Sequence, residues 1–549
     1  MKSTMQDVEL SIADILEHGA ASFGTSKVFT LHGGGVEETT FASIADRSAR
    51  LATALKSLGV DTGDRVGTLA WNTPEHLECY FAVPSMGAVL HTLNARFSAE
   101  QLAWCINDAG TSTIIVDDTL LETLAGCLPM TDNVRTVIHY QNGQDDEPAA
   151  AIYLEQVTAA GIHVVQYEDL ISTNDPLSEW VRVPERSAAA ICYTSGTTGH
   201  PKGVVYSHRS IWLQSLLNTS GVQFGLSHQD TILPAVPMFH VMGWNLLYSA
   251  FMVGSDVILT NRSNQALPLL EVIEKLKPTF GAGVPSIWGD IAHTYDSDSS
   301  RDYDISSLTR ISSGGAIVPD RLITWWQVKH HVALLHGCGM TETSSTMTSG
   351  IPPQGFDYET VSSYQRTQGQ FLVGVQSRVV DEHGDPLPKD GKTAGELQLR
   401  GPWVAKGYLN GNGDALNADG WLATGDIATI SPEGYVTYTD RIKDIIKSGG
   451  EWISSVALEA HLAGHPGVRE AAVIAVDDEK WQERPAAFIV AKGEPPSAES
   501  LRQYVAEAFP KFWVPDQWIF TPEIPRTSVG KFNKKLLREN LQTPTNDHG

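Results

Sequence analysis

The sequence predicts an α/β protein with a large N-terminal domain and a smaller α+β domain at the C-terminal end. The chain has 549 residues, too many for one hydrophobic core, so at least two domains are expected. Helix and strand signals alternate through the first two thirds of the chain, as in parallel sheets covered by helices. From about Gly369 to Tyr438, short runs between Gly, Pro, Asp and Asn turns predict antiparallel β-structure, which we interpret as a small β-barrel.

The first elements follow from apolar periodicity. One amphipathic helix has apolar or small residues at spacings of four and three, followed by a glycine: Ile44, Ser48, Leu51, Leu55 and Leu58. An Asp-Thr-Gly-Asp turn then leads into a strand over 66–70. Further helix and strand signals follow over 82–90, 99–108 and 112–116, and the polar run at 142–151 predicts an exposed loop.

The chain after Asp440 predicts a compact α+β unit. Helices are expected over 456–462 and 501–508, and strands over 473–476 and 487–490.

Composition excludes several classes of partner. The 39 Lys and Arg residues face 64 Asp and Glu, giving a formal net charge of −25, which opposes nucleic acid and anionic membrane as partners. Any anionic ligand must therefore be held by locally placed cations and dipoles. No uninterrupted apolar run reaches the roughly 18 residues of a membrane span, and residues 1–10 lack the apolar core of a signal peptide. The five cysteines show no CxxC spacing, so we expect a cytoplasmic protein.

A loop rich in hydroxyls and glycines lies between two short apolar strands, 188–192 and 204–206. Residues 193–203 read Tyr-Thr-Ser-Gly-Thr-Thr-Gly-His-Pro-Lys-Gly. Glycines let backbone N–H groups approach an anion closely, hydroxyls donate to phosphate oxygens, and Lys202 adds a positive charge. The loop therefore predicts a polyphosphate site. It is not a P-loop, because Gly203 rather than Ser or Thr follows Lys202.

This stretch resembles the signature of the acyl-adenylate-forming superfamily, which comprises acyl-CoA synthetases, peptide-synthetase adenylation domains and beetle luciferases. The resemblance runs from about Phe41 to Leu537, and further motifs follow in the family's order. It implies an N-terminal AMP-binding domain, 1–440, and a mobile C-terminal domain, 441–549. The segments 237–244 and 448–455 look most like those of medium-chain acyl-CoA synthetases and methylmercaptopropionate–CoA ligases.

The resemblance also implies a role for each matching residue. Those that bind ATP or AMP are Thr194, Ser195, Gly196, Thr197, Thr198, Gly199, Lys202, Gly314, Gly315, Ala316, His336, Gly337, Cys338, Thr341, Asp426, Arg441 and Lys531. Those with catalytic roles are Lys531, Thr194, Glu342 and His240, of which Glu342 and Thr194 bind Mg²⁺. The acyl group is contacted by His240, Trp244, Val284, Pro285 and Gly315. Coenzyme A is bound by Ser448, Gly449, Gly450, Glu451 and Trp452, and Lys443 is the interdomain hinge.

The residue types fit these roles. Mg²⁺ on a nucleotide needs few protein ligands because phosphate supplies oxygens, so the single carboxylate of Glu342 suffices. A carboxylate such as Asp426 can accept hydrogen bonds from two ribose hydroxyls at once. Read alone, His240 in its apolar run would be a core histidine, and Lys531 one lysine among several near the C-terminus.

One position departs from the family. Relatives usually have Tyr or Trp where this chain has Cys338, so an aromatic face for adenine is lost and sulfur offers only a small contact. Either neighbouring residues cover the base or ATP binds more weakly. The sequence alone predicts that Cys338→Tyr leaves ATP affinity unchanged or improves it.

We therefore expect an ATP-dependent carboxylate–CoA ligase that uses ATP, Mg²⁺ and coenzyme A and forms a homodimer. It would act on a short- or medium-chain acid, such as a fatty acid or 3-methylthiopropionate. Alternatives are an aryl acid CoA ligase of the coumarate or benzoate type and a stand-alone adenylation enzyme acting on a carrier protein. Segment 532–549 is too short for a fused carrier domain. A luciferase-like oxygenase and a non-catalytic nucleotide-binding protein are further alternatives.

Overall fold

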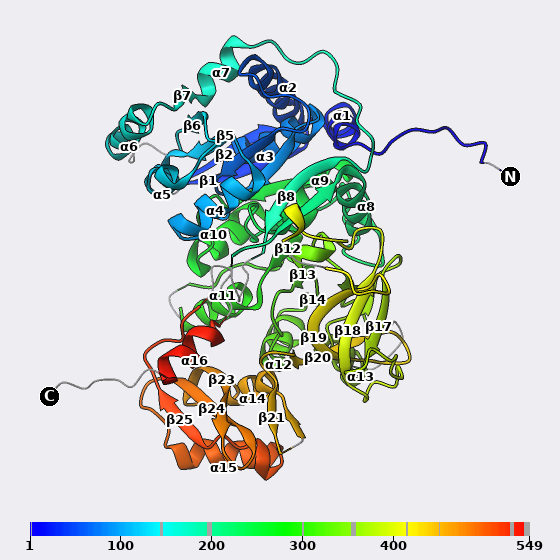
Figure 1. Cartoon of the computed structure of the whole chain (residues 1–549), viewed down its shortest axis with the longest axis vertical. Coiled ribbons are helices and arrows are strands. Elements are labelled where there is room, and N and C mark those ends of the chain that lie inside the picture. Colours follow the sequence, from blue (N-terminus) through cyan, green and yellow to red (C-terminus); the bar gives the residue numbers. More distant parts are fainter. Residues whose placement is uncertain are drawn as a thin grey trace.

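The computed structural model describes the chain except residues 2, 34, 143–146, 195–199, 299–300, 353–357, 413–414, 450, 527–531 and 543–549. For residues 147–149, 358–360 and 542 it describes the backbone only. The molecule has two parallel-sheet units, a smaller antiparallel unit beside them, and a C-terminal domain at the opposite end from the N-terminus (Figure 1).

The first sheet carries the hydroxyl- and glycine-rich loop at its edge. Its seven strands run in the order β7-β6-β5-β3-β4-β8-β9, all parallel except β9, which is antiparallel to β8. In chain order they are β3 (Arg65–Leu69), β4 (Val89–Thr92), β5 (Thr113–Asp117), β6 (Thr136–Tyr140), β7 (His163–Gln166), β8 (Ala188–Tyr193) and β9 (Gly203–Ser207).

The second sheet has the same plan. Its order is β14-β13-β12-β10-β11-β1-β2, with β2 as the antiparallel edge strand. The strands are β1 (Lys27–His32), β2 (Gly35–Thr40), β10 (Thr231–Pro234), β11 (Asp256–Leu259), β12 (Phe280–Gly283), β13 (Arg310–Ser313) and β14 (Ala333–His336).

Helices cover these sheets and pack between them. The predicted helix at 44–58 is α2, where Thr40 caps the first turn and Phe41 stacks on Phe251 of α9 at 3.8 Å between ring centroids. The helices of the large domain are α1 (Ile12–Phe23), α2 (Phe41–Ser57), α3 (Pro74–Ser85), α4 (Ala99–Ala109), α5 (Leu121–Cys127), α6 (Glu147–Ala159), α7 (Tyr167–Thr173), α8 (His208–Thr219), α9 (Leu246–Val253), α10 (Ala266–Leu276), α11 (Pro285–Ser297), α12 (Asp320–Thr324) and α13 (Tyr358–Arg366).

The antiparallel unit lies where the sequence predicts a small barrel. Its strands pair in the order β17-β18-β19-β20, and a bridge between Gln370 and Tyr435 joins β16 to the start of β20. Within the described residues the edge strands β17 and β20 are not paired with each other. The strands are β15 (Thr348–Ser349), β16 (Gln370–Phe371), β17 (Gln376–Val380), β18 (Gly395–Arg400), β19 (Leu422–Ile430) and β20 (Val436–Arg441).

The C-terminal domain is the predicted α+β unit with its own core. Apolar residues from its strands meet those of α14 and α15, for example Ile489, Leu458 and Leu501, all fully buried. Its elements are β21 (Ile446–Ser448), β22 (Glu451–Ile453), α14 (Ser455–Leu462), β23 (Val468–Asp478), β24 (Gln482–Ala491), α15 (Ala498–Ala508), β25 (Gln517–Phe520) and α16 (Lys534–Gln542). No helix in the described part of the chain combines the length and apolar character needed to cross a bilayer.

The prediction of one exposed loop is wrong in part. The polar run 142–151 predicts an exposed loop, but Asn142 is buried and α6 already begins at Glu147. The Asn142 side chain donates to Asp117 at 2.5 Å and to Asn261 at 2.8 Å, so its amide joins the first sheet to the loop after β11. These partners are distant in sequence, and local composition therefore points to an exposed loop.

Candidate active site

The two ends of the hydroxyl- and glycine-rich loop are held together by the β8–β9 hairpin. The Thr194 N–H donates to the Lys202 carbonyl at 2.9 Å, and the Lys202 N–H donates to Thr194 Oγ1 at 3.4 Å. The predicted nucleotide residues Ser195, Gly196, Thr197, Thr198 and Gly199 lie outside the described residues. Both Thr194 and Lys202 are placed at the mouth of this loop.

Lys202 and Glu342 share an aromatic neighbour, Tyr408. Its ammonium is 4.8 Å from the centroid of the Tyr408 ring, and the Tyr408 hydroxyl donates to Glu342 Oε1 at 2.7 Å. Glu342 is 8% exposed, and Thr341 next to it accepts a hydrogen bond from the Tyr206 hydroxyl at 2.7 Å. The fold thus gathers a cation, a carboxylate and two phenols from segments far apart in sequence.

The glycine turn at 314–316 lies against the segment that precedes Glu342. A β-carbon on Gly314 would come within 3.1 Å of the Gly337 carbonyl, and one on Gly315 would meet Val284 at 3.6 Å. His336 is buried with a ring nitrogen 3.3 Å from the Ala316 carbonyl, and burial lowers its pKa to about 4. A neutral, enclosed imidazole fits a role in positioning the turn better than direct contact with phosphate.

Residues 241–245 form a left-handed turn between His240 and α9. Their φ angles lie between +46° and +59° over five successive residues, of which four are not glycine. Each L-residue in this region costs about 1–2 kcal/mol. Such strain occurs mostly at functional sites, and here it presents half-buried His240 and Trp244. The Trp244 ring would lie 3.5 Å from a β-carbon on Gly314, so the acyl and nucleotide candidates meet.

Side-chain amides and hydroxyls from the surrounding elements fix this turn. Asn218 of α8 donates to the Trp244 carbonyl at 3.1 Å, and Asn245 donates to the Ser344 carbonyl at 2.8 Å. Ahead of the turn, Asn72 donates to the Val236 carbonyl at 2.9 Å, and Thr92 donates to the Phe239 carbonyl at 3.1 Å.

Asp426 and Arg441 face each other across the β19–β20 pair. Arg441 Nε is 2.8 Å from Asp426 Oδ1, and the charge of Asp426 raises the pKa of Arg441. Close by, the Cys338 thiol donates to the Tyr438 hydroxyl at 3.1 Å. The predicted ribose and adenine residues therefore lie on neighbouring strands and turns.

The last helix, α16, contacts the predicted hinge at Lys443. Arg538 of α16 donates to the Lys443 carbonyl at 3.3 Å and to Asp444 at 2.6 Å. Burial lowers the pKa of Lys443. Across the hinge, the Ser455 hydroxyl at the start of α14 donates to Asp440 at 2.6 Å.

The predicted coenzyme A loop is not brought to the other residues. Ser448 and Glu451 are paired in the β21–β22 hairpin, away from the two parallel sheets (Figure 1), and Trp452 is 46% exposed. Gly449 has φ +61° and no room for a β-carbon beside Trp481, while Gly450 lies outside the described residues. The site as described is therefore arranged around the nucleotide and acyl candidates.

Lys531 also lies outside the described residues, but its flanks are defined. Arg526 pairs with Phe532 in a β-bridge and lies 3.0 Å from Glu470. Burial raises the pKa of Asp290 on α11, and the charge of Arg526 opposes this rise, so this flank faces the large domain. Figure 1 shows the beginning of α16 close to α11.

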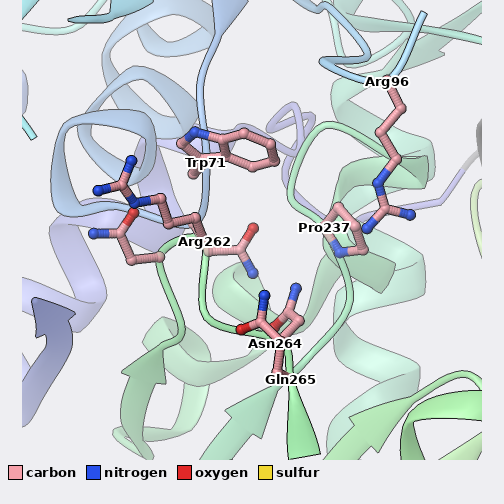
Figure 2. Close-up of a pocket in the computed structure, with 8 residues that line it drawn as sticks. Trp71, Arg96, Pro237, Arg262, Asn264 and Gln265 are labelled. Atoms are coloured by element: carbon pink, nitrogen blue, oxygen red, sulfur yellow. The ribbon is translucent and has the colours of Figure 1, made fainter. Parts of the chain in front are cut away.

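A cationic pocket opens behind the loop that leads to His240. It has a volume of about 300 Å³ and is lined by Trp71, Asn72, Arg96, Pro237, Asn261, Arg262, Asn264 and Gln265. Figure 2 shows Arg96 and Pro237 on one side and Arg262 on the other. Two guanidinium groups in a chain of net charge −25 mark this pocket as suited to an anion.

The sequence does not identify three tyrosines of the site: Tyr206, Tyr408 and Tyr438. Each bonds a residue 66 or more positions away in the chain, namely Thr341, Glu342 and Cys338. Their own neighbourhoods in sequence look like ordinary strands and turns, and carry no signal of these contacts.

Comparison with known proteins identifies the family. The model of the AMP-binding enzyme family matches residues 16–409, and that of the AMP-binding enzyme C-terminal domain matches residues 457–531. A long-chain-fatty-acid–CoA ligase of Thermus thermophilus is 43% identical, covering 98% of this chain and 96% of that protein. A 3-methylmercaptopropionyl-CoA ligase of Ruegeria pomeroyi is 38% identical over 99% of both. The crystal structure of an anthranilate CoA ligase with anthranoyl-AMP has the same fold, with TM-score 0.83, 24% identity and coverage of 98% and 99%. The chain therefore belongs to the AMP-binding enzyme family.

Proposed function

We propose that the chain is an AMP-forming carboxylate–CoA ligase that acts on a short- or medium-chain acid, with the residues gathered around Glu342 at its centre. The observation that carries this proposal is the contact series Lys202–Tyr408–Glu342 beside the β8–β9 loop. The proposal is supported because a phosphate chain with its metal requires both a cation and a carboxylate. ATP, Mg²⁺ and coenzyme A are its cofactors and substrates.

The residues present fit a nucleotide-bound Mg²⁺. Tyr408 engages only Oε1 of Glu342, so within the described residues Oε2 remains for a cation. No group of three or more His, Cys, Asp or Glu in the described part of the chain could hold a metal. One carboxylate with phosphate and water oxygens is the coordination typical of Mg²⁺ on ATP. When bound, Mg²⁺ neutralises phosphate charge, and Thr194 is our second candidate ligand.

In the first half-reaction the carboxylate of the acid attacks the α-phosphate, which gives acyl-AMP and pyrophosphate. Lys202 and the loop hydroxyls would hold the phosphates, while Asp426 would hold the ribose. These groups stabilise the negative charge that builds up at phosphorus as the carboxylate approaches the α-phosphate. Trp244 and Val284 would confine the acyl chain next to the glycine turn.

In the second half-reaction the thiol of coenzyme A attacks the acyl carbon and AMP leaves. The loop 448–452 must then reach the acyl centre, although it now lies in the surface hairpin β21–β22. A turn of the C-terminal domain about Lys443 would bring it there. The pocket between Arg96 and Arg262 suits the phosphates of coenzyme A, because it offers two cations beside the loop that leads to His240.

A panel of acids tests the reaction and its substrate class. Acids from C3 to C12, 3-methylthiopropionate, cinnamates and benzoates are supplied with ATP, Mg²⁺ and coenzyme A, and thioester and AMP are measured. We expect the highest kcat/KM with a short or medium apolar acid, because the apolar Trp244 ring lies close to the glycine turn, 3.5 Å from where a β-carbon on Gly314 would be. AMP formation that requires a carrier protein, or no turnover with any acid, would contradict the proposal.

Lys443→Pro tests the hinge. We expect thioester formation from acyl-AMP to fall at least about tenfold, because proline fixes φ near roughly −65°. Lys443 is the third residue of a turn in which the Asp444 N–H donates to the Arg441 carbonyl at 2.9 Å. Proline is disfavoured there, so pyrophosphate release should also fall, but only about two- to fivefold.

The control is Lys443→Ala, which keeps the backbone free to rotate. We expect both half-reactions of this variant to stay within about threefold of wild type. Equal loss of both steps in Lys443→Pro would show that Lys443 is not the pivot.

Assembly and location stay predictions. The homodimer expected from the sequence is tested by light scattering on the purified chain. Cytoplasmic location is supported by the cysteines, which are all free thiols, four of them buried.

A further inference from the structure

The family resemblance implies an aromatic residue next to adenine where this chain has Cys338, and the structure holds a different aromatic ring beside that position. Cys338 occupies the place in the Gly-Met-Thr-Glu segment, and its thiol donates to the Tyr438 hydroxyl at 3.1 Å. Tyr438 comes from β20, 100 residues further along the chain. Both side chains pack against the apolar core of the antiparallel unit.

Backbone contacts fix the two residues in this relation. The Cys338 N–H donates to Thr348 Oγ1 at 2.8 Å, and the Cys338 carbonyl accepts from the Met347 N–H at 2.9 Å. The Tyr438 N–H donates to Gln368 Oε1 at 2.7 Å. The residue after Cys338 is also packed tightly: a β-carbon on Gly339 would lie 1.5 Å from the Ser345 carbonyl oxygen, so only glycine fits there.

Tyr438 also lies next to the predicted ribose group. Asp426 pairs with Arg441 on the same β19–β20 ladder. Burial raises the pKa of Tyr438, and the neighbouring Cys338 and the Asp426 carboxylate add to this rise. The phenol is therefore neutral at physiological pH and adjacent to both the adenine and the ribose candidates.

The glycine turn approaches the residue that precedes Cys338. Gly314 approaches the Gly337 carbonyl so closely that a β-carbon would sit 3.1 Å from it. A flat base next to residue 338 would therefore have the backbone of this turn and the Cys338–Tyr438 pair as neighbours.

We propose that Tyr438 supplies the aromatic surface for the adenine of ATP that Cys338 does not provide. This inference rests on the proposed function, since it takes the adenine to lie beside residue 338. The physical reason is that a ring face attracts any base, whichever strand presents it. A small residue at 338 is then required, because a second large ring would collide with Tyr438. The earlier expectation for Cys338→Tyr is accordingly reversed: this single change should weaken ATP binding.

The test compares Tyr438→Phe, Tyr438→Leu, Cys338→Tyr and the exchange Cys338→Tyr/Tyr438→Leu. The measurements are KM for ATP, the Kd of AMP by calorimetry, and inhibition by tripolyphosphate, which has no base. We expect Tyr438→Leu to raise the KM for ATP and the Kd of AMP about three- to tenfold. Tyr438→Phe should stay within about twofold of wild type, because it keeps the ring. Inhibition by tripolyphosphate should not change in either variant.

The exchange variant gives the sharper result. Cys338→Tyr alone should weaken AMP binding at least as much as Tyr438→Leu does. The double change should return the Kd of AMP to within about threefold of wild type. Tyr435→Leu is the matched control. Tyr435 is buried and its ring lies tilted against that of Tyr364, with 4.6 Å between centroids, so this change should lower the melting temperature without altering the Kd of AMP.

An unchanged Kd of AMP in Tyr438→Leu would overturn the inference, as would additive losses in the exchange variant. Equal weakening by Tyr438→Phe would show that the hydroxyl matters rather than the ring. None of these outcomes depends on which acid is activated. Failure of wild type to form thioester from ATP, acid and coenzyme A would instead reject the proposed function.

Discussion

Glu342→Gln is expected to lower the rate of acyl-adenylate formation about 10²-fold at millimolar Mg²⁺ while the fold stays intact. The amide keeps an oxygen that can accept from the Tyr408 hydroxyl, which now donates to Oε1 at 2.7 Å. It removes the negative charge, and an uncharged oxygen is a much weaker ligand for a hard cation. The Mg²⁺ concentration that gives half-maximal pyrophosphate release should therefore rise.

A matched control separates this effect from a general loss of charge. Glu271 of α10 is an exposed carboxylate near Arg301, with its side chain 54% exposed, and Glu271→Gln should leave the Mg²⁺ titration unchanged. Tyr408→Phe removes the hydrogen bond and keeps the carboxylate, so we expect a smaller loss than in Glu342→Gln. An unchanged Mg²⁺ dependence in Glu342→Gln would remove Glu342 from the metal site.

The sequence predicts those parts of the fold whose signals lie within one short segment. The helix at 44–58 has apolar periodicity, a capping threonine and a glycine after it, and the structure confirms it as α2. The strands around the hydroxyl- and glycine-rich loop are likewise confirmed as β8 and β9. Glu342 was predicted from its motif, and the structure shows that it shares a neighbour, Tyr408, with Lys202; its role as a Mg²⁺ ligand stays a prediction.

What local sequence misses depends on partners far away in the chain. The left-handed turn at 241–245 contains one glycine, and its other residues favour right-handed backbone. Contacts with distant segments hold the turn: Asn218 of α8 donates to the Trp244 carbonyl within it, and Asn245 of the turn donates to the Ser344 carbonyl. Tyr408 reaches Glu342, 66 positions earlier, from an irregular segment with no motif of its own. Such contacts become visible only once the sheets bring the segments together.

Lys531→Ala is expected to lower acyl-adenylate formation about 10²–10³-fold, which is the usual effect of removing one well-placed donor to a developing oxyanion. In the adenylating arrangement its ammonium would reach the carboxylate and the α-phosphate. The flank at Arg526 already faces Asp290 of the large domain, so the present position of α16 fits that arrangement. Thioester formation from synthetic acyl-AMP and coenzyme A should survive, because the C-terminal domain would by then have turned away.

The measurement supplies acyl-AMP and coenzyme A without ATP and follows acyl-CoA directly, beside the complete reaction. Lys535→Ala is the matched control, since Lys535 is a nearby lysine of α16 with its side chain 59% exposed and 3.8 Å from Glu539. A surface pair of this kind contributes about 0–1 kcal/mol, so both rates should stay close to wild type. If Lys531→Ala loses as much rate with acyl-AMP as in the complete reaction, Lys531 either acts in both half-reactions or stabilises the structure of the C-terminal domain. Alternation of the C-terminal domain between the two half-reactions would then no longer account for the separate roles proposed for Lys531 and the loop at 448–452.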